Sequence, residues 1–186
     1  MNSILLTLFA GYFGLMLFFG MLQEKLIFYP QPVDPRASEL LSEIAFALPV
    51  NDRNSEQTLV LRGWLQLDKP SKQQPLIIYY GGNGEEVSWN FWGFEQLATK
   101  SFLLMNYRGY GDSDGKPGEQ AFYDDALALY DHMVDVKGIN PEHIVLMGRS
   151  LGSGVATYVA SQREVAKLIL VTPFDSLTEV AKVHMP

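Results

Sequence analysis

Hydrophobic positions along the chain form short apolar runs that alternate with longer amphipathic stretches. The short runs are bounded by glycine or polar residues and predict strands over 58–67, 76–80, 102–106, 144–147 and 167–171. The longer stretches repeat apolar residues near a helical period and predict helices over 38–47, 85–99, 120–136, 151–162 and 176–183. Because such alternation is typical of βαβ units, we predict an α/β fold with a mostly parallel sheet and helices on both faces.

The N-terminal run from Ile4 to Leu22 contains no charged residue. As a helix it would be about 28 Å long, close to the thickness of a bilayer's hydrocarbon core. It predicts a transmembrane anchor over 1–24, a single-pass membrane location and contact with the membrane through residues 4–22. The alternatives are a cleaved signal peptide, which lacks its basic start and cleavage site here, and a buried core helix. Lys25 and Arg36 do not specify which side of the membrane the domain faces.

The remaining chain divides into a linker and lead-in over 25–56 and the predicted sheet domain over 57–186. Its net charge of −7, without a stripe of Lys and Arg, argues against nucleic-acid binding. Cysteine is absent, and the three histidines lack metal-ligand spacing, so we predict no disulfide, metal or cofactor. The sequence does not specify an oligomeric state.

The stretch Gly148-Arg149-Ser150-Leu151-Gly152 fits G-x-S-x-G between a predicted strand and a predicted helix. A serine on so tight a turn has a strained backbone, and glycine two positions away on each side avoids a collision. This pattern predicts Ser150 as a nucleophile. The alternative is a plain glycine-serine turn in which Ser150 caps the helix.

A second glycine-rich loop, Gly81 to Glu85, follows the predicted strand at 76–80. Its backbone N–H groups could point at a developing oxyanion. The alternatives are an ordinary flexible turn and a phosphate-binding loop. Neither G-x-x-x-x-G-K-[ST] nor G-x-G-x-x-G occurs, which argues against nucleotide binding.

Five segments together resemble the α/β-hydrolase superfamily, and more narrowly its membrane-anchored, single-pass members that are depalmitoylase-like or monoacylglycerol-lipase-like. The matching segments are QEKLIFYPQP (23–32), YYGGNGE (79–85), NYRGYGDSDGKPGE (106–119), GRSLGSGVA (148–156) and TPFDSL (172–177). The resemblance implies a serine hydrolase that cleaves an ester, thioester or amide bond of a small-molecule acyl or peptide substrate. Two rivals remain open: a non-catalytic, membrane-tethered module of the same fold, and a peptidase related to prolyl aminopeptidases.

The resemblance also implies residue roles. Ser150 matches the nucleophile, and the backbone N–H groups of Leu151 and Asn83 match the oxyanion hole. Gly148 and Gly152 match the glycines of the nucleophile turn. Gly81 stands where the family has a histidine that braces the loop. The replacement of this histidine by glycine is expected to affect the rigidity of the loop and not its chemistry. The loop at 107–119 is expected to be structural, with Arg108 and Asp112 making hydrogen bonds inside it.

The family's triad runs from the serine to an acid and then a histidine, each after a later strand. We therefore expect both partners beyond Pro186, in a domain truncated after the strand at 167–171. Asp175 and His184 are in the right order to replace them, but Asp175 directly precedes a predicted helix and suits a helix cap. A sheet ending at 167–171 would expose apolar residues such as Leu170, which predicts poor folding or aggregation.

Overall fold

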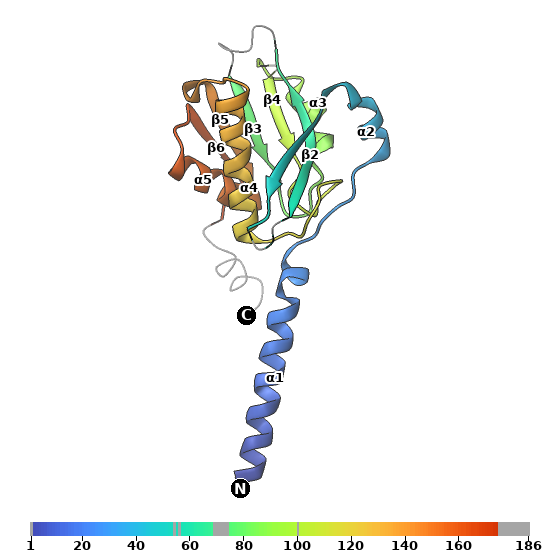
Figure 1. Cartoon of the computed structure of the whole chain (residues 1–186), viewed down its shortest axis with the longest axis vertical. Coiled ribbons are helices and arrows are strands. Elements are labelled where there is room, and N and C mark those ends of the chain that lie inside the picture. Colours follow the sequence, from blue (N-terminus) through green and yellow to red (C-terminus); the bar gives the residue numbers. More distant parts are fainter. Residues whose placement is uncertain (1, 54, 56, 69–74, 100, 175–186) are drawn as a thin grey trace.

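A computed structural model describes residues 2–53, 55, 57–68, 75–99 and 101–174 of the chain. Within its first helix, the side chains of residues 2–4, 19 and 21–26 lie outside this description. Figure 1 shows a sheet flanked by helices, from which the N-terminal helix projects. The predicted helix at 176–183 lies outside the described residues.

A six-stranded sheet forms the centre of the domain, in the order β1-β2-β4-β3-β5-β6. The strands are β1 (Ala45–Asn51), β2 (Thr58–Gln66), β3 (Leu76–Tyr80), β4 (Ser101–Met105), β5 (Ile144–Arg149) and β6 (Lys167–Val171). β1, β2 and β4 pair antiparallel, whereas β4, β3, β5 and β6 are parallel to one another. The predicted α/β fold with a mostly parallel sheet is thus confirmed.

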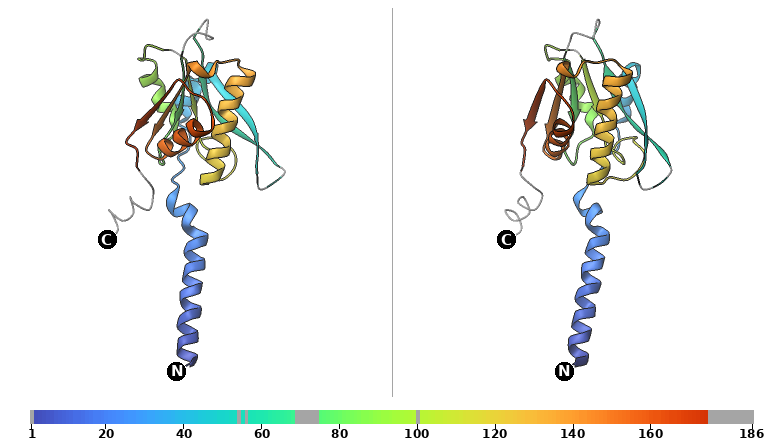
Figure 2. Two further views of the ribbon diagram at one scale, coloured as in Figure 1. Left: turned by 90° about the vertical axis from the view of Figure 1, so that its left-hand side faces the viewer. Right: turned by 60° about the vertical axis from the view of Figure 1, so that its left-hand side comes forward.

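Helices cover both faces of this sheet. The helices are α1 (Asn2–Ile27), which projects from the domain instead of covering the sheet, and α2 (Pro35–Leu40), the 3-10 helix η1 (Ser42–Ile44), the 3-10 helix η3 (Val87–Asn90), α3 (Phe91–Phe94), α4 (Glu119–Asp131), the π-helical turn η4 (His132–Val136), the 3-10 helix η5 (Pro141–His143) and α5 (Leu151–Gln162). Successive side chains of a strand point to opposite faces. Accordingly, Leu76 and Ile78 pack in the core under α4 and α5, while Ile77 and Tyr79 pack in the core beside α3. Figure 2 shows α4 and α5 next to each other on one side of the sheet.

β1 is the element that the hydrophobic pattern missed, because the predicted helix at 38–47 runs into it. The structure has two short helices up to Ile44 and then a strand in which Leu48 and Val50 are buried and their neighbours are exposed. Pro49 argues against a central strand, since proline cannot donate to the sheet's hydrogen bonds. It is tolerated here because β1 lies at the edge of the sheet.

α1 carries exposed apolar side chains, among them Leu6, Phe9 and Tyr12. A helix that crosses a bilayer needs roughly 20 consecutive and mostly apolar residues. No helix in the described part of the chain has the length and apolar character to cross a membrane. The predictions of a single-pass anchor over residues 4–22 and of a membrane location are therefore wrong.

Candidate active site

Three loops meet at the carboxyl ends of β3, β4 and β5. β3 pairs with both neighbours in parallel, with Tyr79 beside Leu104 and Tyr80 beside Gly148. The loops that follow these strands therefore start at the same edge of the sheet, which is where ligands bind in open α/β sheets. These are the loops at 81–85, 107–119 and 148–152 that the sequence singles out.

Ser150 lies on the turn between β5 and α5 in a strained backbone conformation. Its φ is 49° and its ψ is −117°, and it is one of two described non-glycine residues with positive φ. Ser150 is the N-cap residue of α5 by position, but its side chain makes no capping hydrogen bond. The alternative of a helix-capping serine is therefore not supported.

The two glycines of the turn have no room for a side chain. A Cβ atom on Gly148 would lie 2.2 Å from the carbonyl oxygen of Gly152, and one on Gly152 would lie 2.0 Å from that of Tyr80. Backbone atoms cause both clashes, so a rotamer change cannot relieve them. The sterics that the G-x-S-x-G spacing implies are thus present around Ser150.

The loop from Gly81 to Glu85 lies next to the Ser150 turn. A Cβ on Gly82 would be 3.8 Å from the Ser150 Cβ. The Gly82 N–H donates to the Glu85 carboxylate at 2.6 Å, so it is engaged within the loop. Among the described residues, no group accepts a hydrogen bond from the backbone N–H of Asn83 or Leu151. These are the two amides that the resemblance assigns to the oxyanion hole.

Glu85 ties this loop together. Besides the Gly82 N–H, its carboxylate accepts the Tyr79 hydroxyl at 2.8 Å and the Asn90 amide at 2.6 Å. Burial, reinforced by the Glu85 charge, raises the pKa of Tyr79 well above its ordinary value, so the phenol remains a donor. Arg149 makes a longer ion pair with Glu85, at 3.5 Å, and is more than half exposed.

Two tyrosines from the loop after β4 form hydrogen bonds with the loop at 81–85. The Tyr107 hydroxyl donates to the Gly81 carbonyl at 3.0 Å, and the Tyr110 hydroxyl donates to the Asn83 side chain at 2.8 Å. Burial raises the pKa of Tyr110 to about 12, although the backbone N–H of Tyr29 lowers it. Gly81, Gly82 and Asn83 thus each have a hydrogen-bond partner, in a loop that lacks the family's histidine. Sequence reasoning missed these tyrosines, because nothing local in the sequence specifies their partners.

The loop at 107–119 is itself anchored by a buried ion pair. Arg108 is 4% exposed and donates to both carboxylate oxygens of Asp125 on α4, at 2.5 and 2.7 Å, and to Asp52 at 2.9 Å. Hydrogen bonding to Asp125 raises the pKa of Arg108, so the guanidinium stays charged. The backbone carbonyl of Asp112 accepts from Arg62 on β2 at 2.6 Å. Arg108 and Asp112 thus have the expected structural role. Their hydrogen bonds, however, join the loop to residues outside it and not to other residues of the loop.

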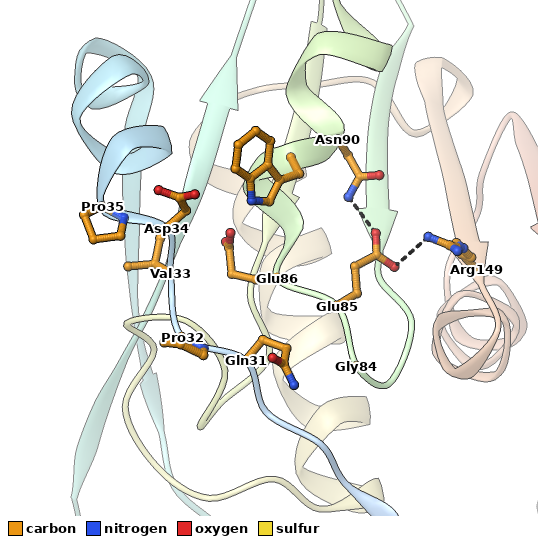
Figure 3. A pocket seen from close by; sticks show the side chains of 11 residues that line it. Gln31, Pro32, Val33, Asp34, Pro35, Gly84, Glu85, Glu86, Asn90 and Arg149 are labelled. Carbon is orange, nitrogen blue, oxygen red and sulfur yellow. Dashed lines mark hydrogen bonds and ion pairs between the residues drawn. The ribbon is translucent and has the colours of Figure 1, made fainter.

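A groove of about 650 Å³ opens beside this site. Figure 3 shows one wall formed by Gln31 to Pro35, and the other formed by Gly84, Glu85 and Asn90 with Arg149 beyond. Ser150 does not line the groove, but Arg149, its neighbour in the chain, does.

The structure brings neither described histidine to Ser150. His132 packs against Phe46 with ring centroids 5.7 Å apart, and His143 precedes β5 at the opposite end of that strand from Ser150. Asp175 and His184 lie outside the described residues. Among the described residues, no histidine therefore lies beside Ser150.

Similar proteins include several with curated descriptions. The chain is 32% identical over 181 residues to an uncharacterized protein of Mycobacterium tuberculosis, covering 93% of this chain and 61% of that protein. It is 31% identical over 166 residues to the lysophosphatidylserine lipase ABHD12 of Gallus gallus, covering 84% of this chain and 42% of the lipase. The chain thus spans between about two fifths and three fifths of the length of these relatives.

Solved structures have the same fold. An alpha-beta hydrolase from Vibrio vulnificus superimposes with a TM-score of 0.65 at 23% identity, over 83% of this chain and 56% of that one. The Pyrococcus furiosus esterase Pf2001 gives 0.62 at 20% identity, over 85% and 63%. The family model described as the alpha/beta hydrolase fold matches residues 74–185. With this match, the sheet order and the loops at its carboxyl edge, the chain belongs to the alpha/beta-hydrolase family.

Proposed function

We propose that the full-length protein is a serine hydrolase that cleaves an ester, thioester or amide bond through an acyl-enzyme on Ser150. The observation that carries the proposal is the strained Ser150 turn, with a positive φ between two glycines that have no room for Cβ. Strain of this kind is concentrated at functional sites. The same geometry is what a nucleophile turn requires.

In the proposed reaction the Ser150 Oγ forms a bond to the substrate's carbonyl carbon, and its proton passes to a general base. The carbonyl oxygen becomes an oxyanion that accepts hydrogen bonds from the Asn83 and Leu151 amides. The bond to the leaving group then breaks, and the leaving group takes the proton from the base. Water repeats these steps on the acyl-enzyme and releases the acid.

The first substrate class to test is an acyl ester of a lipid. The support is the name of the Gallus gallus relative, a lysophosphatidylserine lipase, together with the groove lined by Arg149, the residue that precedes Ser150 in the chain. A peptide substrate is the alternative within the same mechanism.

The test is labelling of the full-length protein with a fluorophosphonate probe and hydrolysis of p-nitrophenyl esters. Ser150→Ala should abolish labelling and lower kcat by about 10⁴-fold or more, since nothing replaces the attacking atom. Ser161→Ala is the matched control, because Ser161 is an exposed serine on the same helix. Equal labelling of wild type and Ser150→Ala, or no labelling of either, would overturn the proposal in favour of a non-catalytic module.

A further inference from the structure

The segment that joins α1 to the domain is hydrogen-bonded to the loop at 81–85. The Asn83 side chain donates to the Ile27 carbonyl at 2.5 Å and accepts from the Tyr29 N–H at 3.2 Å. Ile27 is the last residue of α1, where helix carbonyls lack a partner within the helix. The Asn83 side chain therefore satisfies the last carbonyl of α1 and also binds the Tyr29 N–H.

A second route from this segment passes through the aromatic core. Phe28 is 8% exposed and packs edge-on against Phe122, with ring centroids 5.2 Å apart. Phe122 stacks on Tyr107 at 4.3 Å, and the Tyr107 hydroxyl donates to the Gly81 carbonyl. A displacement of Phe28 would thus shift Phe122 and Tyr107, and through the Tyr107 hydroxyl it would shift Gly81.

A third contact joins the segment to the loop after β4. The Gly111 N–H donates to the Gln31 carbonyl at 2.8 Å. Gly111 has a φ of 53°, and a Cβ there would lie 2.3 Å from the Asn106 side chain, so its place is closely fixed. The same loop contributes Tyr110, whose hydroxyl shares the Asn83 Oδ1 with the Tyr29 N–H.

We propose that residues 27–31 are a positioning element of the active site, which orients the Asn83 peptide so that its N–H faces the oxyanion. The inference rests on the proposed function, because it assumes that the Asn83 amide is an oxyanion donor. Such donors act only from a narrow range of positions, so a loop held by the segment catalyses better than the same loop released. Any event that displaces the segment would accordingly lower activity at Ser150.

The test begins with Tyr29→Pro, which removes the N–H that Asn83 accepts. Tyr29→Ala is the matched control, because it removes a mainly exposed ring and keeps the N–H. Amide hydrogen exchange at residues 82–85 of the full-length protein should become about five to ten times faster in Tyr29→Pro and stay within about twofold of wild type in Tyr29→Ala. Unchanged exchange in Tyr29→Pro would overturn the positioning role whatever the protein's activity.

Asn83→Ala is the second variant, used if Tyr29→Pro does not fold. It keeps the backbone N–H at position 83 and removes the side-chain hydrogen bonds to the segment and to Tyr110. Both variants should lower kcat for an ester about tenfold with little change in KM, less than the 10² to 10³ expected when a donor is lost outright. A fall in stability with kcat intact would reduce the segment to a simple tether. If wild type and Ser150→Ala are equally inactive, the proposed function fails, while the exchange measurement still decides the role of the segment.

Discussion

The two halves of the candidate site are held in place by different forces. The Ser150 turn is shaped by exclusion, because Gly148 and Gly152 leave no space for a Cβ between β3, β5 and α5. The loop at 81–85 is shaped by attraction, through hydrogen bonds to its own Glu85 and to three groups outside it: Tyr107, Tyr110 and the segment at 27–31.

This difference has a consequence for tolerance to change. Steric exclusion acts through rigid backbone atoms, so a single added methyl group meets the full cost of the clash. In the loop at 81–85 several hydrogen bonds share the stabilisation, and each contributes about 1 kcal/mol to the free energy of unfolding. The Ser150 turn should therefore fail abruptly when altered, and the 81–85 loop should fail by degrees.

The largest effect is expected for Gly152→Ala. The added Cβ would lie 2.0 Å from the Tyr80 oxygen and 2.6 Å from the Gly81 oxygen. The free energy of unfolding should fall by at least about 3 kcal/mol, and labelling of Ser150 should be lost.

The control for this variant is Gly154→Ala in the same helix, where a Cβ would meet nothing within 4 Å. It should raise stability by about 0.5 to 1 kcal/mol, because alanine favours helix over glycine. Denaturant unfolding of both variants decides the matter. Equal stability of the two would show that sterics do not shape the turn.

An intermediate effect is expected for Glu85→Gln. The carboxylate accepts from three donors, and an amide keeps only one acceptor oxygen while its NH₂ group faces a donor. The free energy of unfolding should fall by about 1 to 3 kcal/mol, and kcat should fall with it. Glu119→Gln, at an exposed glutamate that accepts only the Tyr123 hydroxyl among the described residues, is the control and should cost about 0.5 kcal/mol. A kcat unaffected by Glu85→Gln would mean that the loop does not depend on this carboxylate.

The smallest effect is expected for Arg149→Met. The Arg149 guanidinium is more than half exposed and 3.5 Å from a carboxylate that already has three closer donors. An exposed ion pair of this kind is worth at most about 0.5 kcal/mol, so the unfolding midpoint should barely move. A loss above about 1 kcal/mol would place Arg149 among the groups that brace the loop.

Sequence patterns predicted most of the sheet. The runs at 76–80 and 167–171 coincide with β3 and β6. The remaining predicted strands differ from β2, β4 and β5 by one or two residues at one or both ends. The prediction failed where local signals conflict with tertiary context. β1 contains a proline that only its edge position tolerates, and the predicted helix at 85–99 is limited to the short helices at 87–94.

The apolar run at 4–22 shows another limit. Composition and length alone predict a membrane span there, whereas the structure confirms a helix and, among its described residues, no helix suited to cross a membrane. The same N-terminal region yields a contact that its sequence does not suggest. Tyr29 and Asn83 are separated by 54 positions and meet through one hydrogen bond.

Local sequence was sufficient for most of the strands and helices, with β1 as the exception, and for the tight turn at Ser150 with its two glycines, because periodicity and backbone sterics act over a few residues. The partners of Asn83, Gly81 and Arg108 emerged only in three dimensions. Their hydrogen bonds join residues that are far apart along the chain and that meet once β3, β4 and β5 pair side by side. The type of a side chain determines whether it can donate or accept a hydrogen bond. Which atom it bonds to depends on how the strands of the sheet pair.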